Sequence, residues 1–173
     1  MTTAARTIRI SEQTRIRVAP VLRAVLLSEL LVPSPLIWLV SPWITDVDVI
    51  DNSGGEFDAV FGDDPVTVCR LSDALARINA AGARIHVVTR PDAHNEPFVH
   101  RLKAAAPPGR LKVTQAPEVH EKTMCGQEWM LTGSMNFTIR GMTVNDEAVT
   151  YSLGGREPAQ ARIDLERRWE STT

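Results

Sequence analysis

The sequence has no apolar run long enough to cross a lipid bilayer, which takes ~20 residues. The longest candidate, residues 21–40, is interrupted by Arg23, Glu29, Pro33 and Pro35. The amino-terminal stretch MTTAARTIRI also lacks the apolar segment of a secretory signal peptide. We therefore expect a cytoplasmic protein without a membrane partner.

Cysteine is scarce as well. The chain has two cysteines, Cys69 and Cys125, and they form neither a Cys-x-x-Cys pair nor a zinc-like cluster. We expect both to be reduced thiols in the core, and we expect no metal and no cofactor.

Positive charge is not in excess, because the net charge is −2 and the pI is near 6.1. This balance is not typical of a strong non-specific nucleic-acid binder. The charge is unevenly spread, since residues 46–64 hold seven acids and no Lys or Arg. Basic residues gather instead in the first 18 residues and at Arg101, Lys103, Arg110 and Lys112. Each cluster alone is typical of a solvated surface.

A chain of 173 residues has the length of one domain. We expect residues 1–18 to form an amino-terminal arm, whose alternating pattern suits a strand or a lead into the next helix, and residues 19–173 to form the domain. Helices are expected over 21–32, 73–81, 95–103 and 157–170, the second and third capped by Ser72 and Asn95. Strands are expected over 36–44, 83–89, 110–115, 119–125, 128–132 and 146–153.

The segments between these elements read as turns and loops. Residues 51–65 are rich in Gly, Asp and Pro, which indicates a loop, and residues 136–142 suit a short helix or turn. Because strands alternate with helices along most of the chain, the sequence predicts a layered α/β domain. Short hairpin-like pairs in the second half indicate a mixed, mostly parallel sheet flanked by helices.

One stretch, HEKTMCGQEWMLTGSMNFT, collects four kinds of polar side chain. It begins at His120, has Lys122 two residues later, and reaches Gly133, Ser134 and Asn136 after a short spacer. On a strand, residues i and i+2 point to the same face, so the His and the Lys share one. A returning strand would bring the Gly-Ser turn and the Asn to the same spot.

Such a spot suits chemistry on a phosphate ester. An imidazole can attack phosphorus and form a covalent intermediate. An ammonium, a carboxamide and a hydroxyl can hold phosphoryl oxygens. The stretch has no carboxylate cluster of the kind that binds magnesium or calcium, so the chemistry it predicts needs no metal.

These residues resemble the signature of the phospholipase D superfamily, which is His-x-Lys, a spacer that usually includes Asp, and Gly-Ser-x-x-Asn or a close variant. The run GSMNFT is especially similar to the single-motif bacterial nuclease branch, whose turn reads Gly-Ser-x-Asn-Phe-Thr. Glu147 stands where that branch has a Glu that supports the catalytic His. The resemblance covers residues 36–153 and implies a phospholipase D-like domain. A fainter likeness to small members of bacterial phage-defence and 7-deazapurine DNA-modification cassettes implies further subunits as partners.

The resemblance also implies an assembly and a mechanism. The family's site contains two His-x-Lys motifs and this chain has one, which implies a homodimer with both motifs at a two-fold interface. One His120 would attack a phosphodiester and the second would protonate the leaving oxygen. Lys122 and Asn136 would hold the non-bridging oxygens, Ser134 would donate to them or to the turn, and Glu147 would orient the imidazole. The implied activity is a metal-independent phosphodiesterase, a nuclease that acts on DNA rather than RNA.

The sequence departs from the family pattern in the spacer. Cys125, Gly126 and Gln127 occupy the region of the family's Asp, and the spacer is one residue short. Two alternatives therefore stay open. One is a non-catalytic or partner-dependent nucleic-acid-binding subunit, and the other is a phospholipid hydrolase.

Each candidate residue also has a plainer interpretation. His120 could be a core histidine, Lys122 a surface lysine and Glu147 an ordinary acid at a strand end. Ser134 and Asn136 could simply stabilise a turn.

Four further residues lie outside the motif. We interpret His86, His94 and His100 as structural or surface residues. Trp43, at the end of an early predicted strand, is a candidate for lining the site.

Overall fold

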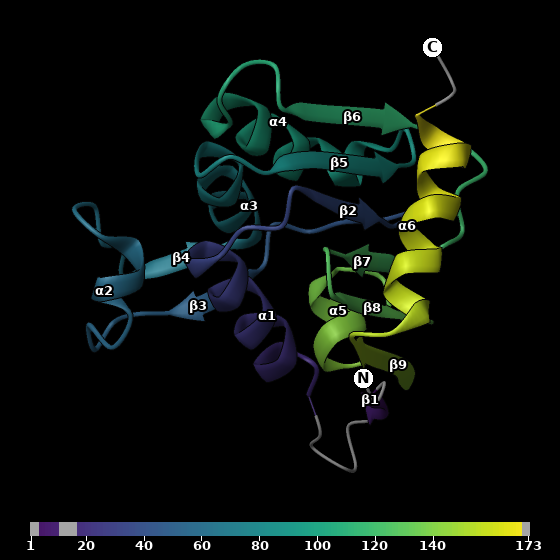
Figure 1. Cartoon of the computed structure of the whole chain (residues 1–173), viewed down its shortest axis with the longest axis horizontal. Helices are drawn as coiled ribbons and strands as arrows, with labels where there is room; N and C mark the ends of the chain where they lie inside the picture. Colours follow the sequence, from purple (N-terminus) through teal and green to yellow (C-terminus); the bar gives the residue numbers. More distant parts are fainter. Residues whose placement is uncertain (1–3, 11–16, 171–173) are drawn as a thin grey trace.

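The computed structural model describes residues 4–10 and 17–170, and its central feature is a sheet of seven strands (Figure 1). The strands lie in the order β1 (Ala4–Ile10), β9 (Glu147–Leu153), β8 (Trp129–Gly133), β7 (Thr123–Cys125), β2 (Leu36–Val40), β5 (Arg84–Thr89) and β6 (Leu111–Gln115). The predicted layered α/β fold with a mixed sheet is confirmed. The parallel pairs, however, are confined to β2, β5 and β6, and the pairs from β2 through β7, β8 and β9 to β1 are antiparallel.

Helices cover both faces of this sheet. The larger core lies between one face and the helices α1 (Ala19–Leu31), α3 (Leu71–Ala80), α4 (Glu96–Ala105) and α5 (Ile139–Thr143). The smaller core lies between the other face and α6 (Arg156–Trp169), which crosses β7, β8 and β9 (Figure 1). Strand β2 shows the two layers, because Ile37 and Leu39 point into the larger core while Trp38 and Val40 point under α6. A strand buried on both faces reads as the continuous apolar run seen in the sequence.

The predicted loop at residues 51–65 is wrong in part. It contains the short helix α2 (Asp58–Phe61), and it is flanked by β3 (Asp48–Asp51) and β4 (Val68–Arg70), which form a separate antiparallel pair. Asn52 organises the segment: its amide donates to Asp58 Oδ1 at 2.8 Å and to the Val66 carbonyl at 3.0 Å. These contacts join residues up to 14 positions apart, which the local Gly, Asp and Pro content does not reveal.

Two predicted helix caps are also corrected. Helix α3 begins at Leu71, and Ser72 lies inside its first turn, where its backbone N–H and hydroxyl both donate to Asp46 at 2.9 Å. Helix α4 does begin directly after Asn95. The Asn95 side chain, however, binds the backbone of the β2 and β5 loops instead, accepting from Ile44 N and donating to the Pro42 and Arg90 carbonyls.

The amino-terminal segment forms an outermost strand of the main sheet. Strand β1 pairs with β9 in antiparallel register from Ala4 opposite Leu153 to Ile10 opposite Glu147. Ile10 is 1% exposed and belongs to the larger core. Residues 1–3 and 11–16 of the predicted arm lie outside the described residues.

Candidate active site

The candidate site lies along one edge of the sheet, where several strand ends meet. Strands β2, β5 and β6 are parallel, so their carboxyl ends share this edge. Strand β7 runs the opposite way and β8 turns back, so β7 starts here and β8 ends here. In open α/β sheets, the carboxyl ends of parallel strands are the usual location of a binding site.

His120 is exposed and lies on the segment between β6 and β7, at this edge. The predicted strand over 119–125 is shorter than expected, since β7 begins at Thr123. The Arg90 guanidinium approaches the imidazole, with Nη2 at 3.1 Å from Nδ1 and 3.0 Å from Nε2, and its Nε donates to the Val119 carbonyl at 3.1 Å. Lys122 Nζ donates to the His120 carbonyl at 2.6 Å. An imidazole and two cations thus lie together.

The Gly-Ser turn follows directly at the end of β8. A Cβ on Gly133 would lie 2.0 Å from the Ala148 carbonyl oxygen, so only glycine allows β8 and β9 to approach this closely. Gly133 N donates to the Lys122 carbonyl at 3.2 Å. The turn is therefore tied to the His-x-Lys segment on one side and to β9 on the other.

Ser134 and Glu147 form a pair at the start of β9. The Ser134 hydroxyl donates to Glu147 Oε2 and accepts from Ala148 N at 3.0 Å. Asn145 Nδ2 donates to the second carboxylate oxygen of Glu147 at 3.4 Å. Within the described chain, the Glu147 carboxylate thus binds Ser134 and Asn145 rather than His120.

Asn136 lies between the β8 turn and the end of β2. Its Oδ1 is 3.5 Å from the hydroxyl of Ser41, and the backbone of Phe137 bridges to Ile44. Asn136 and Trp43 line one pocket of about 540 Å³. The structure therefore places Trp43 beside a residue of the motif.

Arg90 and Asp92 are site neighbours that the sequence patterns did not single out. Arg90 lies over the Trp43 ring, with Cζ 4.9 Å from the ring centroid, while also contacting His120. Asp92 accepts from Trp43 Nε1 at 3.3 Å and from His94 N at 2.9 Å. The His94 backbone N–H, helped by the Trp43 indole, lowers the pKa of Asp92 below its usual value. The Asp92 carboxylate therefore stays charged at neutral pH.

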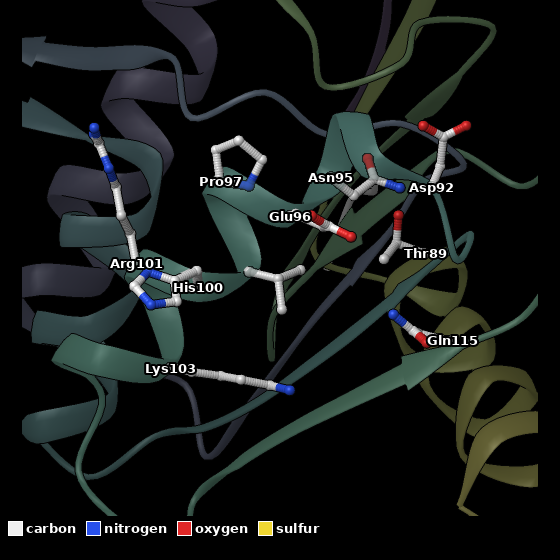
Figure 2. A pocket seen from close by; sticks show the side chains of 10 residues that line it. Thr89, Asp92, Asn95, Glu96, Pro97, His100, Arg101, Lys103 and Gln115 are labelled. Atoms are coloured by element: carbon white, nitrogen blue, oxygen red, sulfur yellow. The ribbon is translucent and has the colours of Figure 1, made fainter.

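A second pocket, of about 660 Å³, adjoins this edge (Figure 2). Thr89 and Gln115 reach it from the ends of β5 and β6, and His100 and Lys103 reach it from α4 (Figure 2). Asp92, which accepts a hydrogen bond from the Trp43 indole, also lines this pocket, so the pocket lies next to Trp43.

The spacer that lacks the family's Asp is held by a carboxylate from α1. Glu29 is 4% exposed and accepts from Trp129 Nε1 at 2.5 Å and from the Ser34 backbone N–H and hydroxyl, both at 2.6 Å. The Ser34 hydroxyl in turn accepts from Gln127 N at 2.8 Å. A Cβ on Gly126 would lie 2.4 Å from Trp129 Nε1, so this turn needs glycine. Glu29 thus organises the turn between β7 and β8.

The remaining candidates are structural. His86 is 7% exposed and meets the Trp38 ring edge-on, with centroids 4.6 Å apart. Cys69 and Cys125 are free and buried as expected, and burial raises the pKa of each thiol to about 12. Over residues 4–10 and 17–170, no three His, Cys, Asp or Glu side chains are grouped so that they could hold a metal ion. In the same described part of the chain, no helix is long and apolar enough to cross a membrane.

The fold and the site edge define a layered α/β domain whose polar groups gather where strand ends meet. The sequence model of a family described as "Cardiolipin synthase, PLD-like domain" matches residues 59–169. The chain therefore belongs to the phospholipase D-like family, as the motif resemblance predicted. No curated protein matches the sequence.

Solved structures share this fold. NucT from Helicobacter pylori is 11% identical, with a TM-score of 0.63, and the match covers 98% of each chain. Nuc from Salmonella typhimurium, a phospholipase D family member, is 15% identical with a TM-score of 0.62, covering 98% of this chain and 95% of that one. TrmBL2, described as an archaeal chromatin protein with a novel mode of DNA binding, is 12% identical with a TM-score of 0.58, covering 97% and 53%. At such identities, the similarity shows the fold.

Proposed function

We propose that this protein is a metal-independent phosphodiesterase that cleaves nucleic acid in the cytoplasm, with DNA as the preferred substrate. The observation that carries the proposal is the exposed imidazole of His120 at the edge where Lys122, Ser134 and Asn136 also gather. Arg90 adds a second cation within 3.1 Å of the imidazole. Two cations beside a nucleophile suit a substrate whose reacting group is an anionic phosphate.

Several cations lie along the carboxyl ends of the strands, although the chain as a whole has a net negative charge. Arg90 and Lys122 flank His120, and Arg140 lines the Trp43 pocket. A net charge of −2 therefore coexists with a basic strip at the strand ends. Such a strip suits the phosphate backbone of a nucleic acid.

The proposed reaction has two steps and uses two copies of the chain. A ring nitrogen of His120 attacks the phosphorus, and the bond from phosphorus to the leaving oxygen breaks as the N–P bond forms. His120 of the partner subunit gives its proton to the leaving oxygen. It then takes a proton from water, whose oxygen attacks the phosphorus and releases the first imidazole.

The other residues would hold the phosphate or its neighbours. Lys122 and Asn136 are proposed to bind the non-bridging oxygens. The Lys122 ammonium has three N–H donors, so it can do this while one of them still binds the His120 carbonyl. Ser134 would donate to the same oxygens or hold the turn. Glu147 is proposed to orient His120, and within one chain it holds Ser134 and Asn145.

The substrate test uses purified protein in excess EDTA with single-stranded DNA, double-stranded DNA, RNA and phospholipid vesicles. We expect cleavage of DNA, its loss in His120→Ala, and its retention in the matched control His100→Ala, which also changes an exposed histidine. Cleavage of the lipid alone would support the phospholipid hydrolase instead.

The shared site can be tested by mixing subunits. If both imidazoles act in one site, a dimer with one His120→Ala subunit is inactive. Activity after unfolding and refolding a mixture should then fall as the square of the wild-type fraction. A linear fall would contradict a site built from two chains.

The alternative function is a nucleic-acid-binding subunit that is non-catalytic or needs a partner from a DNA-modification or defence system. The observation that favours it is the spacer, where Cys125, Gly126 and Gln127 occupy the region of the family's Asp. Salt-dependent binding of DNA without cleavage, by both wild type and His120→Ala, would support this alternative.

A further inference from the structure

Trp43 is an exposed indole in the middle of the site edge. Its exposed fraction is 36%, whereas Trp38 is fully buried and Trp129 is 6% exposed. It lies three residues after the end of β2 and lines the pocket of about 540 Å³ that also contains Asn136 and Arg140. A large apolar ring at an edge rich in cations calls for a role other than core packing.

Two contacts hold the indole and a third holds its backbone. The Arg90 guanidinium stacks on the ring at 4.9 Å, and the indole N–H donates to Asp92 at 3.3 Å. The Trp43 carbonyl accepts from the hydroxyl of Ser41 at 2.8 Å. A ring fixed before the ligand arrives loses little conformational entropy when the ligand binds.

The same guanidinium links the indole to the proposed nucleophile. Arg90 contacts the Trp43 ring and, through Nη2, the His120 imidazole at 3.0 Å. One side chain thus separates the aromatic ring from the atom proposed to attack phosphorus. A phosphate at His120 would bring an attached nucleoside close to the indole, with Arg140 available for the next phosphate.

We propose that Trp43 stacks an unpaired nucleobase beside the scissile phosphate, so that the substrate is single-stranded DNA. Bases of a duplex already stack on both faces, whereas an unpaired base offers a free face to an aromatic side chain. Base stacking tolerates every sequence, because each base has a π-face. This inference rests on the proposed function, since it assigns the substrate of that same site.

The test measures binding, in a His120→Ala background and in EDTA, so that it does not depend on cleavage. A labelled oligo(dA) and an abasic oligomer of equal length carry the same phosphates but differ in bases. We expect Trp43→Ala to weaken oligo(dA) binding by about 5- to 150-fold, the range for losing one stacked base. Trp43→Phe keeps a ring and should lose less. The control Ile163→Ala, which removes a similarly exposed apolar side chain on α6, should change affinity less than about twofold.

Three outcomes would overturn the inference. They are an equal loss for the abasic oligomer, an equal loss in Ile163→Ala, or unchanged affinity in Trp43→Ala. A single thermal transition with an unchanged midpoint shows that Trp43→Ala is folded. Trp43→Phe tests independently whether an aromatic ring at this position supports binding. Because no turnover is measured, stacking without cleavage would refute only the proposed catalysis. Cleavage without stacking would refute only this inference.

Discussion

The β7–β8 hairpin carries polar groups at both ends, and the two sets differ in burial and in partners. At its turn, Glu29, Ser34 and Trp129 are each at most 6% exposed, and they bind one another. At its open end, His120 and Ser134 are exposed. Buried polar groups must be satisfied within the protein, whereas exposed groups can exchange water for a ligand. The turn thus stabilises the hairpin and the open end is available for chemistry.

The buried network around Glu29 also explains how a changed spacer is compatible with an intact hairpin. The family's Asp is absent, and Gln127 and Gly126 lie at the turn. A carboxylate nevertheless reaches this turn from α1, through Glu29 and the Ser34 hydroxyl that accepts from Gln127 N. We infer that the support lies in the buried network and not in the spacer itself.

The largest effect on stability is expected for Glu29→Ala. The change leaves the Ser34 and Trp129 donors buried without an acceptor, which should cost about 3 kcal/mol of the free energy of unfolding. For a chain of this length, that corresponds to a fall of roughly 6–12 °C in the melting temperature. The exposed acid Glu128 on the same turn supplies the control Glu128→Ala. Scanning calorimetry checks both, and an unchanged melting temperature in Glu29→Ala would show that the buried network does not stabilise the turn.

At the open end of the hairpin, a substitution should lower the cleavage rate much more than the stability. Ser134→Ala removes hydrogen bonds at an exposed site, so the free energy of unfolding should fall by about 1 kcal/mol or less. If the hydroxyl stabilises the reacting phosphate, the cleavage rate should fall about 10²-fold. Cleavage rates and melting curves of Ser134→Ala, measured beside those of Glu29→Ala, compare the two ends of the hairpin directly. A Ser134→Ala variant that is strongly destabilised would show that this end is structural too.

The smallest effect concerns two histidines that differ in burial, the buried His86 and the exposed His100. Burial lowers the pKa of His86, although the Glu170 carboxylate acts in the opposite direction. The unfolded chain therefore binds a proton near pH 6.5 that the folded chain takes up only at lower pH. Stability should be fully present above pH 6.5 and should decline as the pH falls below it.

Urea denaturation at a series of pH values measures this decline. His86→Leu should flatten the dependence on pH below about 6.5, the ordinary histidine pKa. His100→Ala, on the surface, should leave it unchanged. A steeper loss of stability on acidification in His86→Leu would contradict the assignment.

Much of the fold follows from local patterns in the sequence. The apolar run over Leu36–Val40 predicts a buried strand, and the structure buries every residue of β2. The two-stranded unit of β3 and β4 escaped prediction, because it depends on Asn52 reaching distant partners. The shared edge of His120 and Ser134 was predictable, since a hairpin returns to its starting point.

Other features of the site depend on contacts between distant segments. Arg90 lies 30 positions before His120, and no spacing rule joins an arginine to that motif. Glu29 lies 100 positions before Trp129 and looks like one acid in an apolar helix. Such partners become visible only when the sheet places β2, β5 and β7 side by side.

The proposed function requires that His120 cleaves a phosphodiester without a metal. The most direct measurement is the rate of cleavage of single-stranded DNA in excess EDTA by wild type and by His120→Ala, both confirmed as folded. We predict cleavage by the wild type and a loss of at least about 10³-fold in the variant. Comparable cleavage by both proteins, or cleavage by the wild type that stops in EDTA, would contradict the account.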